Sequence, residues 1–283
     1  MVTPGHLTYC KKRVRQFDQD RYLTALFAPE ESRQGLYALY AFNLEIAQIP
    51  EIAREPLVGE IRLEWWRETI AAAYEGTPPE HAVAACLAET IRTHGLTRSC
   101  FDRLLDARSF DQERRPPASA DELKIYAEAT SSNLVRLALE VLGVPKNAAT
   151  EKAALAIGVA WALVGLLRAV PFHGRDERLY LPRDLMETAG VSVRQIRSGK
   201  STPALEGLVH SLADEARACL RAARQVAAEV PATARPALLL GALADGHLGV
   251  LEKAGYNPFD PRVQKPPPFR ELRLWLRARR GKY

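Results

Sequence analysis

The sequence contains no stretch of strand length in which apolar and polar residues alternate, so we expect no β-sheet. It contains no run of about 18 uninterrupted apolar residues, which argues against a transmembrane helix. The four cysteines form no Cys-x-x-Cys pair and have no histidine at metal-ligand spacing. Cys10, Cys86, Cys100 and Cys219 are therefore expected to be reduced thiols in a reducing compartment.

The start of the chain also lacks a targeting signal. Residues 1–12 have no apolar core of the secretory type, and they are too short and too poor in arginine and serine for a transit peptide. We therefore expect a cytoplasmic chain. Hydrophobic residues make up 47% of the 283 residues, which is enough for a buried core, and aromatics make up only 7%. The dominance of Ala and Leu favours helices over strands.

The net charge of +5 is unevenly distributed along the chain. Residues 262–283 hold eight basic residues and one acid, a net +7, so the remainder sums to −2. Since the positive charge belongs to the C-terminus and no recognition motif is present, we expect no nucleic-acid partner.

Helical periodicity with turn signals between the segments predicts an all-α protein of nine or ten helices. We divide it into a helical domain, residues 1–260, and a basic amphipathic tail, residues 261–283. An irregular segment is expected at residues 171–182. The expected helices cover residues 29–50, 56–74, 81–94, 97–108, 121–142, 149–170, 205–229 and 236–254, followed by a short basic helix in the tail.

Several short motifs occur in a fixed order from about Arg13 to Tyr256. In this order and at these separations they resemble the squalene/phytoene synthase family. The resemblance implies an isoprenoid-synthase-like fold, a single-domain helical bundle around a central cavity. The motifs are Tyr40-Ala41-Phe42, Arg62-Leu63-Glu64-Trp65-Trp66, Tyr126-Ala127-Glu128 before Ser131-Ser132, Leu166-Leu167-Arg168, and Tyr180-Leu181-Pro182.

The acids that such enzymes use are largely missing. Active members carry two motifs with aspartates four residues apart, which on a helix project from one face and gather Mg²⁺ around a diphosphate. Aligned on the flanking motifs, those four positions hold Ala47, Glu51, Ala169 and His173, and an asparagine usual before the second motif is Gly165. The sequence therefore predicts no catalytic residue, no metal site and no cofactor.

Three longer segments, residues 41–48, 126–132 and 167–174, resemble the complex I assembly factor 6 group of mitochondria, an aspartate-depleted branch of the same family. That resemblance implies a non-catalytic, membrane-peripheral factor whose partners are subunits or assembly intermediates of respiratory complex I. Its place would be the cytoplasmic side of a bacterial inner membrane, or the matrix side in a mitochondrion.

Two alternatives remain open. One is an active Mg²⁺-dependent prenyl transferase acting on farnesyl or geranylgeranyl diphosphate, with a metal site rebuilt from Glu51, Glu128 and the row Glu60, Glu64 and Glu68. For that row we favour a solvated helix face interleaved with Arg62 and Arg67 over a metal site. The other alternative is a protein that binds an isoprenoid or lipid without reacting.

If the fold is correct, several polar side chains face the former active cavity. They either tie the helices together or bind a ligand. A buried Arg168 needs an acid, for which Glu45, Glu51 or Glu128 is expected, or a bound phosphate. His173 either binds a ligand at the cavity mouth or caps the preceding helix as a cation. The candidates are Tyr40, Asn43, Gln48, Glu51, Tyr126, Ser131, Ser132, Asn133, Arg168 and His173.

Two aromatic or basic features remain. Trp65 and Trp66 are interpreted as core or cavity lining. The tail helix carries Arg270, Arg273, Trp275 and Arg277, a composition typical of an interfacial helix on anionic lipid. The alternative is a terminal helix docked on the core with its arginines in solvent.

Overall fold

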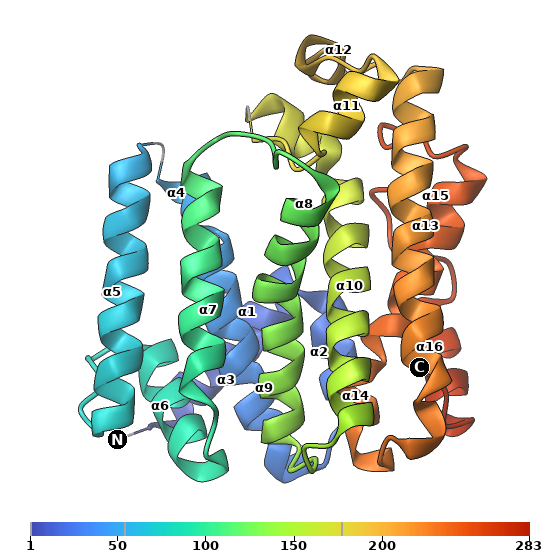
Figure 1. Ribbon diagram of the computed structural model, residues 1–283. Coiled ribbons are helices and arrows are strands. Elements are labelled where there is room, and N and C mark those ends of the chain that lie inside the picture. Colours follow the sequence, from blue (N-terminus) through green and yellow to red (C-terminus); the bar gives the residue numbers. More distant parts are fainter. Residues whose placement is uncertain (1, 54, 177) are drawn as a thin grey trace.

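The computed structural model describes residues 2–53, 55–176 and 178–283. Those residues form helices and turns without a strand, which confirms the all-α class (Figure 1). In Figure 1 the long helices stand roughly side by side, with α5 at one edge and α16 at the opposite edge. The α-helices are α1 (Pro4–Phe17), α2 (Gln19–Ala25), α3 (Glu30–Ala47), α4 (Ile49–Ile52), α5 (Pro56–Glu75), α6 (Ala82–His94), α7 (Arg98–Ser109), α8 (Ala120–Ala127), α9 (Asn133–Val141), α10 (Ala148–Arg175), α11 (Arg183–Ala189), α12 (Val193–Arg197), α13 (Pro203–Gln225), α14 (Arg235–Leu238), α15 (Leu240–Lys253) and α16 (Arg270–Arg279).

The apolar helix α10 is the centre of the bundle, packed against α9, α13 and α15. Asn147 and Thr150 begin it with reciprocal side-chain to backbone bonds. By length and composition α10 could cross a membrane, but 61% of its most apolar 18-residue segment is buried inside the bundle. The expectation that residues 171–182 are irregular is wrong for the first part, because α10 continues through Pro171 to Arg175. Gly174 allows this, since a Cβ there would lie 2.9 Å from Ile196 of α12.

The segment expected as one helix, residues 121–142, is interrupted by a π-helical turn at Glu128–Ser132. Side chains bond across it: Thr130 Oγ1 donates to Tyr126 O at 2.7 Å, and Asn133 Nδ2 donates to Ala129 O at 2.9 Å. Ser132 Oγ also donates to Leu155 O of α10, at 2.9 Å. The turn therefore directs successive polar side chains to different neighbours, as π-bulges at functional sites often do.

Several helices, most of them short, were not expected from the sequence, which is why the described residues form more than nine or ten. The first of them, α1, is capped by Thr3, whose side chain accepts from His6 N, with Pro4 at the first helical position. It packs against α3 and α6 and buries Cys10 and Val14 in the core.

The C-terminal segment folds back onto the helices. Val263, Leu274 and Tyr283 are at most 3% exposed. Arg224 Nε donates to Tyr283 O at 2.9 Å, and the Tyr283 hydroxyl donates to Ala223 O at 3.3 Å. The basic tail is therefore anchored at both ends by buried side chains.

Candidate functional site

A cavity of about 260 Å³, here called the central cavity, lies between α2, α3, α7, α8 and α10 and is open to solvent. Two of its lining residues are Ala47, at the end of α3, and Gly165 of α10, so small residues stand at two positions where the family resemblance implies acid or amide groups. The cavity is lined by Asp18, Arg21, Asn43, Leu44, Ala47, Arg108, Tyr126, Thr130, Ser131, Trp161, Ala162, Gly165 and Leu166.

One wall is a buried polar network around Asp111, which is only 4% exposed. Its Oδ1 accepts from the hydroxyls of Tyr126 at 2.7 Å and Tyr180 at 2.6 Å. Its Oδ2 accepts from Arg108 Nη1 at 3.1 Å, and the same nitrogen donates to the Tyr126 hydroxyl at 2.9 Å. Sequence reasoning missed Asp111 and Arg108, because neither lies in one of the motifs.

Electrostatics keep the guanidinium of Arg108 charged in this network. Burial disfavours the guanidinium, but Tyr126 and Asp111 outweigh it and raise the pKa of Arg108 above its usual value. Burial, aided by the neighbouring carboxylate of Asp111, raises the pKa of the Tyr126 and Tyr180 phenols. The phenols therefore stay protonated and act as donors to Asp111.

A second arginine enters the cavity from α2. The Arg21 guanidinium lies 5.8 Å from the ring centroids of both Tyr40 and Trp161. Its Nη1 donates to Asp18 Oδ2 at 2.8 Å, and the residue is 8% exposed. Tyr40 itself is core, 1% exposed, and reaches the cavity only as the support of Arg21.

His173 neither caps α10 as a cation nor lines the central cavity. Its ring lies 4.6 Å from that of Tyr180, in an apolar pocket with Leu123 and Leu212. Burial, and after it the cation of Arg178, lowers the pKa of His173 to about 4. A neutral imidazole gains nothing from the helix dipole, so the capping interpretation is wrong.

The expected acid partners of Arg168 are also wrong. Its side chain turns to the C-terminal segment, where Nε donates to Val263 O at 3.3 Å. Burial lowers the pKa of Arg168 while the nearby carboxylate of Asp20 opposes the shift. Asp20 in turn lies 3.2 Å from His247 Nε2 and 2.9 Å from Arg270 Nη1. Arg168 thus belongs to a buried charge cluster that holds the tail, and not to the central cavity.

Only two of the next five polar candidates lie at the central cavity. Asn43 and Ser131 line the central cavity. Gln48 lies outside it, where its side chain accepts from Arg13 Nη2 at 3.0 Å, and Glu51 is exposed on α4. Ser132 is fully buried against α10 and holds the helices together.

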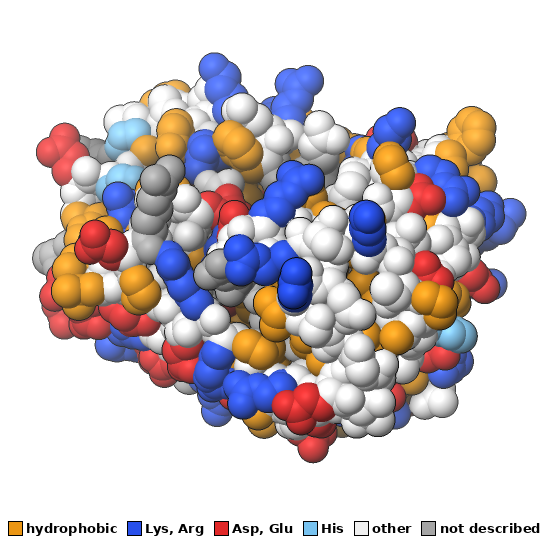
Figure 2. All heavy atoms as spheres, turned by 90° about the horizontal axis from the view of Figure 1, so that it is seen from above, with side chains coloured by type: hydrophobic (Ala, Val, Ile, Leu, Met, Phe, Trp, Pro, Cys, Tyr) orange, Lys and Arg blue, Asp and Glu red, His pale blue; other side chains and the backbone are white. Residues whose placement is uncertain are grey.

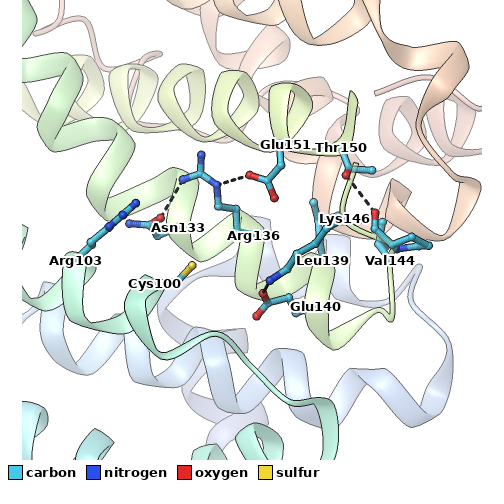
Figure 3. Close-up of a pocket in the computed structure, with 11 residues that line it drawn as sticks. Cys100, Arg103, Asn133, Arg136, Leu139, Glu140, Val144, Lys146, Thr150 and Glu151 are labelled. Atoms are coloured by element: carbon cyan, nitrogen blue, oxygen red, sulfur yellow. Dashed lines mark hydrogen bonds and ion pairs between the residues drawn. The ribbon is translucent and has the colours of Figure 1, made fainter. Parts of the chain in front are cut away.

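Asn133 belongs to a different pocket, of about 250 Å³, which Figure 3 shows. There Arg136 donates to Asn133 Oδ1 at 3.0 Å and to Glu151 at 2.9 Å. Lys146 pairs with Glu140 at 2.7 Å. The charges of Arg136, Glu151, Lys146 and Glu140 are therefore paired with one another, whereas Arg103, which also lines the pocket, is exposed.

The glutamates of α5 do not converge. Glu60 accepts from Ser109 Oγ at 3.1 Å, Glu64 pairs with Arg67 at 3.1 Å, and Glu68 is exposed. Within residues 2–53, 55–176 and 178–283, no three His, Cys, Asp or Glu side chains lie close enough together to hold a metal ion.

The two tryptophans differ in environment. Trp66 is 4% exposed and packs edge-on against Phe42, with ring centroids 5.1 Å apart, as expected for core. Trp65 is 38% exposed, so the interpretation of both as core is wrong for this one. It faces outward because it lies on the solvent side of α5 with Leu57 and Ile61.

The tail candidates also separate into two groups. Arg270 bonds to Asp20 and Arg277 pairs with Asp245 at 3.2 Å, so both face the bundle. Arg273 and Trp275 face outward, and Arg279 lies over the Trp275 ring at 4.7 Å.

Comparison with known proteins agrees with this architecture. The model of the squalene/phytoene synthase family matches residues 14–271. The chain is 32% identical to the complex I assembly factor 6 of Bos taurus over 97% of this chain and 82% of that protein. It is 26% identical to phytoene synthase 3 of Zea mays over 91% of this chain and 62% of that protein. A dehydrosqualene synthase crystal structure superposes with a TM-score of 0.86 at 20% identity, covering 98% of this chain and 96% of the other. The chain belongs to the squalene/phytoene synthase family.

Proposed function

We propose that this protein is a non-catalytic assembly factor for respiratory complex I that works at a membrane surface. The observation that carries the proposal is the combination of 32% identity to an assembly factor with small residues, Ala47 and Gly165, in the central cavity. Mg²⁺ needs clustered oxygen ligands to neutralise a diphosphate, and methyl groups supply none. We propose that the chain acts on the cytoplasmic side of a bacterial inner membrane or on the matrix side in a mitochondrion.

The surface offers an apolar stripe for a protein partner. Leu57, Ile61 and Trp65 follow one another at helical spacing on α5 and are 71%, 60% and 38% exposed. Glu64 and the exposed acids at residues 51, 55 and 68 flank the stripe. Figure 2 shows acidic and hydrophobic side chains together at the left rim, the side on which Figure 1 has α4 and α5. Such a surface fits an amphipathic helix with basic flanks.

The tail offers a surface of opposite charge. Phe269, Leu272 and Trp275 are 77%, 54% and 44% exposed, and basic residues surround them. An apolar and basic helix face of this kind suits an anionic lipid surface. Co-sedimentation with phosphatidylglycerol vesicles tests it: Trp275→Ala with Arg273→Glu should lose binding, whereas Ile125→Ala on α8 should not.

The assembly role is tested in cells that lack their own relative of this protein. The intact chain should restore mature complex I on native gels, and Ile61→Asp should not. Ile125→Asp, at an equally exposed position (67%) away from the stripe, is the matched control. Failure of the unmodified chain to restore the complex contradicts the proposal.

The enzymatic alternative needs a separate assay. The purified protein is incubated with farnesyl diphosphate and Mg²⁺, and diphosphate release is measured. We expect none above background. Turnover at ordinary enzyme rates of about 1 s⁻¹ or more would establish an active prenyl transferase and end the non-catalytic proposal.

A further inference from the structure

Two exposed apolar helix faces stand at opposite edges of the bundle (Figure 1). One is the apolar stripe of α5. The other, here called the tail face, carries Phe269, Leu272 and Trp275. α5 packs against α6 and α7, and α16 packs against α15, with these faces turned to solvent. Apolar patches rimmed by charge usually mark contact with another molecule, so each face is available to one.

The two faces carry opposite charge. α5 contains four acids and two bases, a net −2, whereas α16 contains four bases and one acid, a net +3. Glu64 and Glu68 are exposed beside the apolar stripe, and Arg273 and Arg280 are exposed beside the tail face. Opposite charges attract across an interface and like charges repel. The tail face therefore fits α5, whereas α5 against α5 or α16 against α16 would set like charges together.

These charges can form new pairs without breaking old ones. In the part of the chain that the structure describes, Arg273, Arg280 and Glu68 take part in no ion pair. Arg270 and Arg277 are different, because they pair with acids of the bundle and hold the tail in place. The inner side of α16 is thus engaged, while its outer side is left to a partner.

The two apolar faces also match in length. At 1.5 Å per residue the stripe from Leu57 to Trp65 extends about 12 Å, and the tail face from Phe269 to Trp275 extends about 9 Å. Helices of this length in contact bury less than the roughly 1,600 Å² of a standard interface. We therefore expect a weak contact, with a dissociation constant on the order of 10–100 µM.

The position of the faces decides which α5 the tail can reach. Since α5 and α16 lie at opposite edges of the bundle, the tail face cannot cover the stripe of its own chain (Figure 1). For the same reason two copies cannot make both contacts at once and close as a dimer. A contact between two different surfaces repeats from copy to copy, and it gives a ring or an open chain.

We propose that the tail face of one copy docks on the apolar stripe of α5 of a second copy, so that the protein self-associates head to tail. α16 is itself an amphipathic helix with basic flanks, the kind of partner that the stripe fits. Self-association would cover both faces while the protein is away from lipid and from other partners. The inference does not depend on the assembly role, because it is tested on the purified chain alone.

Sedimentation equilibrium of the full chain, in buffer without lipid, tests the proposal. Between 1 and 200 µM protein in 50 mM NaCl, we expect the average mass to rise from that of one chain to beyond that of two. In 500 mM NaCl the association should be at least threefold weaker, because salt screens exposed charges.

Charge reversal tests each face separately. One variant combines Glu64→Arg with Glu68→Arg, and the other combines Arg273→Glu with Arg280→Glu. Each should associate with itself at least tenfold more weakly than the unmodified chain. The four positions are exposed, so we expect both variants to fold, which circular dichroism checks.

A matched control reverses charges elsewhere. Asp121→Lys combined with Lys124→Glu changes two exposed residues of α8, away from both faces, and should associate as the unmodified chain does.

Mixing the two reversed variants gives the sharpest test. The tail face of the α5 variant is unmodified and fits the unmodified α5 of the tail variant. The reversed tail face, now acidic, fits the reversed α5, now basic. An equimolar mixture should therefore associate to within about threefold of the unmodified chain, although neither variant does so alone.

Four results overturn the proposal. They are a chain that stays monomeric at 200 µM in 50 mM NaCl, association that stops at a dimer, unchanged association in both folded reversed variants, and a mixture that associates no better than its components. If the tail face binds only lipid and the stripe binds only a foreign protein, the first result is the one observed.

Discussion

Acidification should destabilise this protein through His173. The ring is packed against Tyr180, and burial together with Arg178 lowers the pKa of His173 from 6.5 to about 4. The carboxylates of Asp111 and Asp176 oppose this shift without cancelling it. Because the folded state binds the proton more weakly than the unfolded state, the contribution is complete above pH 6.5 and is lost as the pH falls towards 4.

The size of the effect follows from the shift. A difference of about 2.5 pKa units corresponds to about 3 kcal/mol in full, and roughly 2 kcal/mol of it is lost by pH 5. Urea unfolding at pH 7.5 and pH 5.0 measures the loss in the unmodified chain and in His173→Phe. The variant keeps an aromatic ring in the pocket but cannot be protonated, so its loss should be smaller by about 2 kcal/mol.

The comparison isolates one group. Asp20 and His247 also titrate with lowered pKa values, but they are present in both proteins and cancel in the difference. Phe172→Ala is the control, because it changes the residue next to His173, which is 54% exposed and does not titrate. This variant should lose as much stability between pH 7.5 and pH 5.0 as the unmodified chain. If His173→Phe loses as much stability as the unmodified chain, the argument from burial is refuted.

Three further changes test the packing. Gly158→Ala should lower the free energy of unfolding in urea by about 1–3 kcal/mol, because its Cβ would lie 2.4 Å from Ser132 Cα. Gly165→Ala on the same helix is the control: its Cβ meets nothing within 4 Å, so the substitution should raise that free energy by up to about 1 kcal/mol. Tyr126→Phe removes a donor to buried Asp111 and should cost about 1–2 kcal/mol in the same measurement, with Tyr9→Phe, a half-exposed tyrosine, unchanged. Asp20→Ala removes the buried carboxylate that pairs with Arg270 and His247 and should cost about 3 kcal/mol in urea unfolding. It should also release the tail, so that trypsin cleaves at Arg273 before the rest of the chain; cleavage at the unmodified rate would contradict this role of Asp20.

Periodicity predicted the long helices well, because their boundaries are marked in the sequence. Pro56 begins α5, Gly76 ends it with a left-handed backbone, and Gly95 does the same for α6. The interruption at residues 128–132 was not predictable in this way, since it depends on bonds from Ser132 to α10. Pro171 gave a false stop, because packing of Gly174 against α12 holds the helix together beyond it.

The candidate site was predicted in its position but not in its chemistry. Motif spacing placed Ala47, Asn43 and Ser131 at one cavity, and the structure brings them together. It gave no signal for Arg21 or Arg108, because an arginine on an amphipathic helix is most often a solvated residue. Arg168 showed the reverse. It is partly buried, but its side chain bonds to Val263 O in the segment before α16, since a long side chain can leave the face on which its Cα lies.

The charges around the cavity are balanced by the protein's own side chains. In a magnesium site, carboxylates on facing helices repel one another until cations bind. Here Ala47 and Gly165 remove that repulsion, and each remaining acid of the cavity wall is matched to a guanidinium: Asp18 to Arg21, and Asp111 to Arg108. The walls are therefore charge-balanced without ions.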